Sequence, residues 1–332
     1  MKRPSVTILI TGGLGFIGLH LIRLVLRKYP DWSLRILDNE SVGRREDLAC
    51  LLDEEFPGER RGVERDRLDI ISGDICDTDC VKHATKGCDS VVHLAASTGV
   101  HTSIQNPAES VRVNALGTLN VLEAARKKHV RRVVLASSNA AAGEPNNSDY
   151  GPFCVTPVSP YGAGKLCLEA LASAYWRSME LETVCLRFAN VYGPYSGRKS
   201  SVVAKWISRI LNGEPVEIYG DGSQTRDFVW AGDIAQAIVS SLESPHAPGE
   251  IFQIGSGESI SILQLVERLR KVSGLDFPVE FVPAPPGEIQ RVRCDMRHAR
   301  HLLGLSELTP IEYGLPITWS WFARRWPSGR DA

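Results

Sequence analysis

The stretch T-G-G-L-G-F-I-G, residues 11–18, constrains the fold of this 332-residue chain more than any other. It follows the apolar run Val6–Ile10, which is typical of a buried strand. It precedes Leu19–Tyr29, where leucines and isoleucines recur at helical spacing. Glycines at 12, 15 and 18 permit a tight turn and let the backbone approach a pyrophosphate. The free N–H groups in the first turn of a helix can bind that pyrophosphate. The stretch therefore predicts a strand–turn–helix unit that binds a dinucleotide.

The same alternation of strand and helix continues through the first half of the chain. Further strands are predicted at Ser33–Asn39, Leu68–Ile75, Ser90–Ala96 and Arg131–Ser138, and a helix at Ala115–His129. Such alternation predicts an α/β fold with a Rossmann-type, doubly wound parallel sheet that binds ligands at the carboxyl ends of its strands.

Beyond Leu181 the pattern becomes irregular and rich in turn residues. We therefore expect a cofactor-binding domain over residues 1–180, to which some later segments return. A smaller α/β domain over residues 181–332 would bind the substrate.

Asp38 bears on the choice of dinucleotide, because it ends the second predicted strand, 20 residues after Gly18. A carboxylate at this place suits the ribose diol of NAD and repels the 2′-phosphate of NADP. Arg44 and Arg45 follow closely, and an arginine there could accommodate that phosphate. The sequence favours NAD and leaves NADP open.

Charge and composition exclude several other classes of protein. The formal net charge is −1, which gives no electrostatic case for binding nucleic acid or a membrane surface. The first apolar run is too short for a secretory leader, and no run approaches the length of a membrane span. The eight cysteines include no C-x-x-C pair, so zinc-ligand spacing is absent and no metal is expected. We expect a cytoplasmic protein with reduced thiols.

The stretch S-P-Y-G-A-G-K, residues 159–165, places Tyr161 four residues before Lys165. On a helix this spacing puts both side chains on one face. The pair alone is equally compatible with a packed tyrosine beside a solvated lysine.

Further motifs occur in order along the chain, among them H-L-A-A, V-N-A-L-G-T-L-N-V-L-E-A-A-R, L-R-F-A-N-V-Y-G-P and Y-G-D-G-S-Q-T-R-D-F. With these the chain resembles, up to about Gly304, the extended short-chain dehydrogenase/reductases. Within that family it is most similar to the NAD-dependent nucleotide-sugar epimerases and dehydratases, in particular the UDP-glucose and UDP-glucuronate 4-epimerases. The resemblance implies an NAD cofactor, a UDP-sugar substrate and a homodimer formed by the helices that contain N-A-L-G-T-L and Y-G-A-G-K.

The resemblance also implies a catalytic set of Ser138, Tyr161 and Lys165. A free tyrosine has a pKa of about 10, which is too high for an efficient base at neutral pH. The charge of Lys165 favours the phenolate, so that Tyr161 can take a proton from a sugar hydroxyl while hydride leaves the same carbon. Ser138 would hold that hydroxyl in place.

Other residues receive binding roles through the same resemblance. Asp38 and Asn39 would contact ribose, Asp74 and Ile75 the adenine side, and Asn114 would stabilise the fold near the nicotinamide. The full set implied for the cofactor is Gly12, Gly15, Phe16, Ile17, Gly18, Asp38, Asn39, Asp74, Ile75, Leu94, Ala95, Ala96, Asn114, Ser137, Tyr161 and Lys165.

The substrate set implied for the nucleotide sugar is Ser138, Asn190, Arg198, Tyr219, Arg226 and Arg291. Asn190 and Arg226 would contact the diphosphate, since a guanidinium can bind two oxygens at once, and Tyr219 would border the base. Relatives carry R-P-G-D/E where this chain has P-P-G-E, residues 285–288, which raises the importance of Arg291.

The residues after Ser138 bear on the type of reaction. Dehydratases of the family have a T-D-E run here, and decarboxylases a glutamate two residues after the Ser/Thr, whereas this chain has Asn139 and Ala140. Without those acids we expect 4-epimerisation, by oxidation at C4, rotation of the keto sugar and return of hydride. A nucleotide-keto-sugar reductase, a UDP-glucuronate decarboxylase and a non-catalytic NAD-binding regulator remain alternatives. Ala142 stands where epimerases usually carry a tyrosine.

The identity of the sugar depends on the loop Y-S-G-R-K-S-S, residues 195–201. Arg198, Ser200 and Ser201 could accept a C6 carboxylate, and an exposed polar loop explains them equally well. The prediction is a UDP-glucuronate or UDP-glucose 4-epimerase, with UDP-glucuronate preferred.

Overall fold

The computed structural model describes residues 6–143, 155–199, 201–284 and 290–326. Its contacts divide the chain into two compact units. The first unit extends to Phe188 and includes the later segments Ile234–Gln253 and Arg297–Leu305. The second comprises Ala189–Asp233, Ile254–Met296 and the residues from Ser306 onward. Ser200 and the stretch 285–288, both named above, lie outside the described residues.

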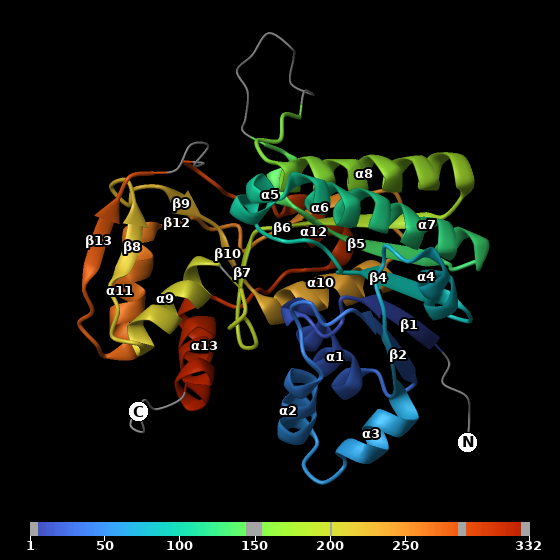
Figure 1. Cartoon of the computed structure of the whole chain (residues 1–332), viewed down its shortest axis with the longest axis horizontal. Helices are drawn as coiled ribbons and strands as arrows, with labels where there is room; N and C mark the ends of the chain where they lie inside the picture. Colours follow the sequence, from blue (N-terminus) through green and yellow to red (C-terminus); the bar gives the residue numbers. More distant parts are fainter. Residues whose placement is uncertain (1–5, 144–154, 200, 285–289, 327–332) are drawn as a thin grey trace. The chain divides into compact units, whose positions relative to one another are not determined.

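A seven-stranded sheet forms the centre of the first unit (Figure 1), with the strand order β11-β6-β5-β4-β1-β2-β3. The pairs β1–β2, β2–β3, β1–β4, β4–β5 and β5–β6 are parallel. The chain runs outward from β1 in one direction and then in the other, so the predicted doubly wound fold is confirmed. The strands are β1 (Val6–Thr11), β2 (Trp32–Asp38), β3 (Leu68–Ser72), β4 (Ser90–His93), β5 (Arg132–Ser138), β6 (Glu182–Phe188) and β11 (Ile251–Ile254).

Helices cover both faces of this sheet, with α4, α7 and α8 on one side and α1 and α10 on the other. Because both faces are covered, β4 and most of β5 are buried along their length, including the polar Ser90, His93 and Arg132. The helices are α1 (Phe16–Lys28), α2 (Arg45–Glu55), α3 (Arg60–Arg67), α4 (Thr78–Thr85), α5 (Val100–Gln105), α6 (Pro107–Val111), η1 (Arg112–Gly117), α7 (Thr118–Lys127), η2 (Asn139–Ala141), α8 (Pro160–Met179), α10 (Ala231–Glu243) and α12 (Arg297–Leu303).

One predicted helix, Ala115–His129, differs from the structure in its first turns. The segment begins as the π-helix η1 and becomes α-helical only at Thr118. Asn114 lies in this wide turn. Its side-chain amide donates to the carbonyl of Ser97 and accepts from the N–H of Ser97, both at 2.9 Å. These side-chain bonds to a separate segment accompany the irregular turn, and helical periodicity along the chain does not reveal them.

The helix that carries Tyr161 and Lys165 starts with clear local signals. The side chain of Ser159 accepts a hydrogen bond from the N–H of Gly162 at 3.1 Å, and Pro160 occupies the first helical turn. Both features favour the start of a helix. The cap provides an acceptor for a backbone N–H of the first turn, and proline has no N–H that would be left unpaired there. Tyr161 is thereby placed in the first turn of α8.

The second unit contains three two-stranded sheets and a separate apolar core. β7 pairs with β10 and β8 with β13 in parallel, whereas β9 and β12 are antiparallel. The elements are β7 (Asn190–Tyr192), α9 (Val202–Leu211), β8 (Val216–Tyr219), β9 (Thr225–Arg226), β10 (Phe228–Trp230), β12 (Ile260–Ser261), α11 (Ile262–Ser273), β13 (Val279–Val282) and α13 (Ile311–Arg325).

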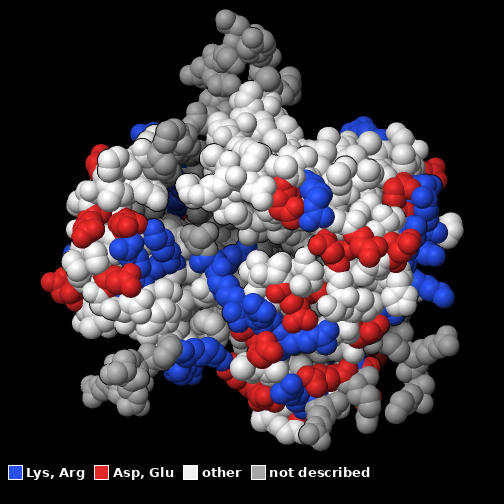
Figure 2. Space-filling view, viewed as in Figure 1, with Lys and Arg blue, Asp and Glu red and all other residues white. Residues whose placement is uncertain are grey.

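The surface has no dominant sign of charge on the face drawn in Figure 2, where acidic and basic side chains are interspersed. No helix among the described residues is long and apolar enough to cross a membrane. The described part of the chain also contains no cluster of three His, Cys, Asp or Glu side chains suited to a metal ion.

Asp227 organises the second unit through four hydrogen bonds to one fully buried carboxylate. One oxygen accepts from the N–H and hydroxyl of Ser256, at 2.7 and 2.8 Å. The other accepts from the N–H groups of Gly257 and Cys294, both at 3.1 Å. The carboxylate therefore joins the residue just before β10 to two loops that are distant in the sequence.

We predict that Asp227→Asn destabilises the second unit by about 3 kcal/mol, because the new amide donor faces two buried N–H groups that then have no acceptor. Urea unfolding measures the change. Asp221→Asn is the control, since Asp221 caps an exposed turn at Ser223, and it should cost less than about 1 kcal/mol. Equal losses for the two variants would contradict the role assigned to Asp227.

Candidate active site

The glycine-rich turn between β1 and α1 is shaped by backbone contacts that exclude side chains. Gly12 has a φ of +70°, and a Cβ built on it would lie 2.6 Å from the backbone nitrogen of Ala95. A Cβ on Gly18 would overlap the carbonyl of Gly13. The turn therefore leaves its backbone open to a ligand at the start of α1, which fits the pyrophosphate of a dinucleotide.

Asp38, at the end of β2, fixes this turn. One carboxylate oxygen accepts from the N–H of Leu14 at 3.0 Å, and the other from the N–H of Glu40 at 2.9 Å. Burial raises the pKa of Asp38, and the two backbone hydrogen bonds oppose that rise. Arg45, which could have served a 2′-phosphate, is paired with Glu40 at 3.0 Å. These contacts fit an adenosine ribose with free hydroxyls, as in NAD.

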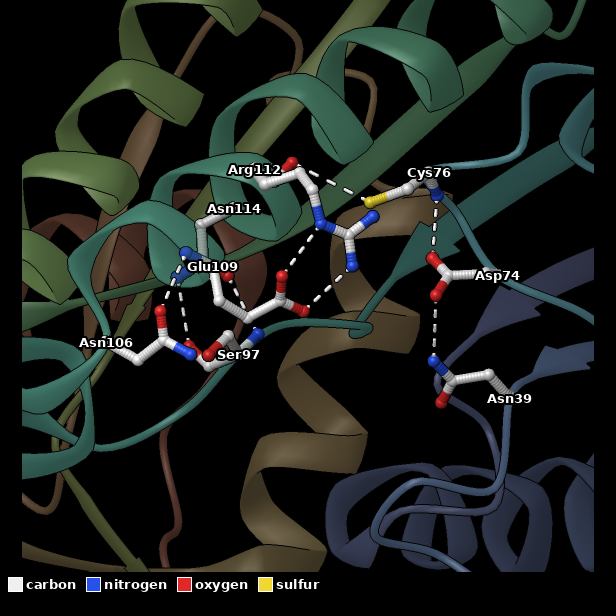
Figure 3. A network of polar contacts seen from close by, with 8 residues as sticks. All are labelled: Asn39, Asp74, Cys76, Ser97, Asn106, Glu109, Arg112 and Asn114. Carbon is white, nitrogen blue, oxygen red and sulfur yellow. Dashed lines mark hydrogen bonds and ion pairs between the residues drawn. The ribbon is translucent and has the colours of Figure 1, made fainter.

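Asn39 and Asp74, predicted separately as a ribose contact and an adenine-side contact, are joined directly (Figure 3). The Asn39 amide donates to Asp74 at 3.1 Å, and the N–H of Cys76 donates to the other carboxylate oxygen at 2.8 Å. Burial raises the pKa of Asp74, but these hydrogen bonds outweigh it and the pKa is lowered overall. Arg112 and Glu109 form a bidentate pair in the same view, with both bonds at 2.8 Å.

The remaining residues predicted for the cofactor lie around these groups in the first unit. Phe16 and Ile17 open α1, and Ile75 is buried, with its carbonyl bonded by Asn120. Leu94, Ala95 and Ala96 follow β4 and are half-buried. The structure therefore brings the predicted cofactor residues to the carboxyl ends of β1, β2, β3 and β4.

Ser138, Tyr161 and Lys165 also come together in the first unit. The Lys165 ammonium lies 5.9 Å from the centre of the Tyr161 ring, and it donates to the carbonyl of Ala136 at 2.6 Å. Burial raises the pKa of Tyr161, and a hydrogen bond with Ser138 opposes that rise. Ser138 ends β5 and Tyr161 begins α8, so the hydroxyl and the phenol meet where the two elements converge.

Ser137, predicted as a cofactor contact, is buried and points to a different partner. Its hydroxyl donates to Glu169 on α8 at 2.5 Å. Arg187 on β6 donates to both oxygens of the same carboxylate at 2.7 Å. Glu169 and Arg187 are not among the residues predicted from the sequence. The available signal was the helical spacing of Tyr161, Lys165 and Glu169, which lie four residues apart on one face.

His93 is a second polar residue that the sequence analysis passed over, although it quoted H-L-A-A. Its ring is buried between the hydroxyls of Thr11 at 2.7 Å and Thr118 at 3.1 Å. Thr118 donates its own hydrogen to the carbonyl of Asn114, so the Nε2 of His93 must donate to Thr118. The Nδ1 then accepts from Thr11. Burial, and to a smaller extent the charge of Lys165, lower the pKa of His93 to about 3.

The substrate residues predicted in the second unit lie on several segments. Asn190 opens β7 and its N–H donates to the carbonyl of Asp227, the residue after Arg226. Arg291 forms a backbone bridge with Thr225, the residue before Arg226. The structure thus brings the segments of Asn190, Arg226 and Arg291 together. Tyr219, 40% exposed, ends β8, and Arg198 is exposed in the loop after β7.

Comparison with known proteins identifies the family of the chain. The model of the NAD dependent epimerase/dehydratase family matches residues 8–255. A dTDP-glucose 4,6-dehydratase from Streptomyces niveus is 34% identical, over 95% of this chain and 92% of that protein. A UDP-glucose 4-epimerase from Mycolicibacterium smegmatis is 31% identical, over 96% of this chain and 98% of that protein.

Among solved structures, the UDP-glucuronic acid 4-epimerase from Bacillus cereus, in complex with UDP-glucuronic acid and NAD, has a TM-score of 0.85. It is 30% identical, and the match covers 96% of this chain and 99% of that one. The chain belongs to the NAD-dependent epimerase/dehydratase family, whose relatives include both UDP-sugar epimerases and sugar dehydratases. NAD is the cofactor of this family, as the sequence predicts.

The neutral, buried His93 predicts a specific dependence of stability on pH. Its folded-state pKa of about 3 lies below the ordinary 6.5, so the unfolded chain binds the proton more tightly. Stability from this group is complete above pH 6.5 and falls as the pH drops toward 3, by about 1.4 kcal/mol per pH unit at most.

We predict that His93→Asn lowers the free energy of unfolding at pH 8 by about 2 kcal/mol and flattens its decline between pH 6.5 and 4.5. Urea unfolding at several pH values measures both effects. His83→Asn, at an exposed position, is the control and should keep the wild-type decline. An undiminished slope in His93→Asn would contradict a neutral, buried imidazole.

Proposed function

We propose that this chain is a UDP-sugar 4-epimerase that prefers UDP-glucuronate, with UDP-glucose as the other candidate substrate. The observation that supports epimerisation is the convergence of Ser138, Tyr161 and Lys165 at a site where η2, the turn after Ser138, contributes no carboxyl group. Elimination of water requires an acid and a base beside the sugar, and Asn139 and Ala140 supply neither.

The three side chains take distinct parts in the proposed reaction. Tyr161 removes the proton from the C4 hydroxyl and later returns it. Ser138 bonds the phenol, and it holds the sugar hydroxyl in line with it. The charge of Lys165 favours the phenolate against the effect of burial. NAD, when bound, would supply the acceptor and the source of the hydride that is exchanged with C4.

The nucleotide sugar is bound, in this proposal, by residues of the second unit. Arg226 and Arg291 neutralise the diphosphate, because a guanidinium offers paired donors to phosphate oxygens. Asn190 donates to the same group, and Tyr219 borders the base. The Arg198 guanidinium donates hydrogen bonds to the C6 carboxylate of a hexuronate, which would make an acidic sugar the preferred substrate.

The homodimer that the resemblance implies remains part of the proposal. Leu116, within N-A-L-G-T-L, is an exposed apolar side chain that supports it, and Ile104 on α5 and Val111 on α6 are exposed on the helices just before that stretch. Each of these would be covered by a second copy that packs against the same helices. The cytoplasmic location likewise remains a prediction.

The proposed reaction is tested by proton NMR of the purified protein with UDP-glucuronate and with UDP-glucose, without added NAD. A new galacto-configured anomeric signal is the expected result. We predict that Tyr161→Phe slows it by about 10²–10⁴-fold, since the general base is removed. Tyr175→Phe is the matched control, because Tyr175 lies on the same helix and its hydroxyl bonds Glu123.

Other products would assign the alternatives. A methyl doublet indicates dehydration, and a pentose indicates decarboxylation. Turnover of a 4-keto sugar only with added NADH or NADPH indicates a reductase. If Tyr161→Phe retains the activity of the Tyr175→Phe control, the base is a different residue. If no nucleotide sugar reacts with or without cofactor, a non-catalytic role is favoured.

Preference for an acidic sugar is tested separately at Arg198. We predict that Arg198→Ala lowers kcat/KM for UDP-glucuronate about tenfold or more and leaves UDP-glucose within about twofold, since a charge-assisted bond is lost only for the acid. Arg268→Ala, which breaks a pair with Glu312 on the same unit, is the control. Equal losses for the two sugars would contradict the assignment of Arg198.

A further inference from the structure

Three charged side chains, Lys165 and Glu169 on α8 and Arg187 on β6, surround the end of β5. Lys165 and Glu169 are each 3% exposed. All three act electrostatically on the buried thiol of Cys185, whose pKa is raised first by burial and then by Glu169. They therefore lie around one small region of the interior, where charges interact strongly because little water screens them.

Glu169 lies four residues after Lys165, one turn further along the same face of α8. Residues at this spacing are neighbours on a helix, and opposite charges there form ion pairs. In the structure, however, the Glu169 carboxylate is engaged by other groups. Arg187 takes both of its oxygens at 2.7 Å, and Ser137 donates to one of them at 2.5 Å.

We propose that Arg187 is a positioning residue that holds the Glu169 carboxylate away from Lys165, so that the charge of Lys165 acts on Tyr161. The inference rests on the proposed role of Tyr161 as the base. Arg187 and Glu169 touch neither the phenol nor a substrate in this proposal. They act through Lys165, whose ammonium donates to Ala136, the residue that precedes Ser137 on β5.

The two members of the pair should act on Tyr161 with opposite signs. Removal of the positive charge in Arg187→Gln leaves Glu169 to interact with Lys165, and the pKa of Tyr161 rises. Removal of the negative charge in Glu169→Gln leaves the site more positive, and the pKa of Tyr161 falls. A merely structural pair would lower stability in both variants without opposite shifts.

Other titratable groups on the elements around α8 do not provide these effects. His93 is held neutral by burial, and Cys185 stays a thiol. The acids on α6 and α7 are paired with basic groups of neighbouring turns. The titratable and charged residues on the elements that pack against α8 are His101, Glu109, Arg112, Glu123, Arg126, Lys127, Arg132, Glu182, Cys185 and Arg187.

The same two strands offer a matched control at their other ends. In the register of β5 and β6, Ser137 is opposite Arg187 and Arg132 is opposite Glu182. Arg132 donates to Glu182 at 2.7 Å, and Arg132 is as buried as Lys165. Glu182→Gln therefore removes an acid from a similar pair on the same strands, far from Tyr161 along β5.

The direct measurement is the ionisation of Tyr161 in the NAD-saturated protein. Fluorine NMR can be recorded on protein in which 3-fluorotyrosine replaces the eight tyrosines, and it gives one signal for each ring. The phenol of 3-fluorotyrosine ionises at a lower pH than that of tyrosine. The signal that disappears in Tyr161→Phe belongs to Tyr161. This readout needs no substrate, so it is independent of whether the proposed sugars react.

We predict that Glu169→Gln lowers the pKa of Tyr161, and Arg187→Gln raises it, each by about half a pH unit over a separation of roughly 12 Å. The double variant should return close to wild type, and Glu182→Gln should leave the pKa within about 0.1 unit. Where epimerase activity is found, the acidic limb of its pH profile should move in the same directions.

Shifts of the same sign in the two single variants, or no shift in either, would overturn the inference. If Arg187→Gln does not fold because Glu169 is left buried and unpaired, the double variant compared with Glu169→Gln measures the effect of Arg187. That comparison must also raise the pKa of Tyr161. If no epimerisation is found but the two single variants still shift the pKa of Tyr161 in opposite directions, the proposed function is rejected and the electrostatic role of the pair stands.

Discussion

The hydrogen bond from Lys165 to the carbonyl of Ala136 joins α8 to β5, and much of the first unit depends on how that helix meets that strand. Ser138 lies two residues further along β5, and Tyr161 lies one turn earlier on α8. Their contact therefore depends on the register between the two elements. The bond from Ser137 to Glu169 fixes the same register one turn further along.

Burial and hydrogen bonding act against each other throughout this region. Burial raises the pKa of Asp38 and Tyr161, and in both cases hydrogen bonds limit the rise. At Asp74 the hydrogen bonds prevail and the pKa falls. A site built in this way can keep polar groups away from water without leaving them unsatisfied, and it can adjust each group separately through its neighbours.

The parts of the first unit that the sequence predicts are those with local signals. The glycines of the first turn, Asp38 at the end of its strand, and the Ser159 cap before Tyr161 each act within a few residues. The pairing of Glu169 with Arg187 joins a helix to a strand 18 residues later, and neither residue has a local pattern that names its partner. The π-helical turn at Asn114 depends in the same way on Ser97, in a separate loop. Long-range contacts of this kind become visible only when the fold is known.

The hydrogen bonds around His93 have one further consequence. They run in a single direction, from the N–H of Ala95 through Thr11, His93 and Thr118 to the carbonyl of Asn114. Reversal would require the other tautomer of the imidazole, and Thr118 would have to turn its hydrogen from the carbonyl of Asn114 to the Nε2 of His93. The chain of bonds therefore has a fixed polarity. It can hold the glycine turn and the wide helical turn at a set spacing, but it cannot conduct protons between them.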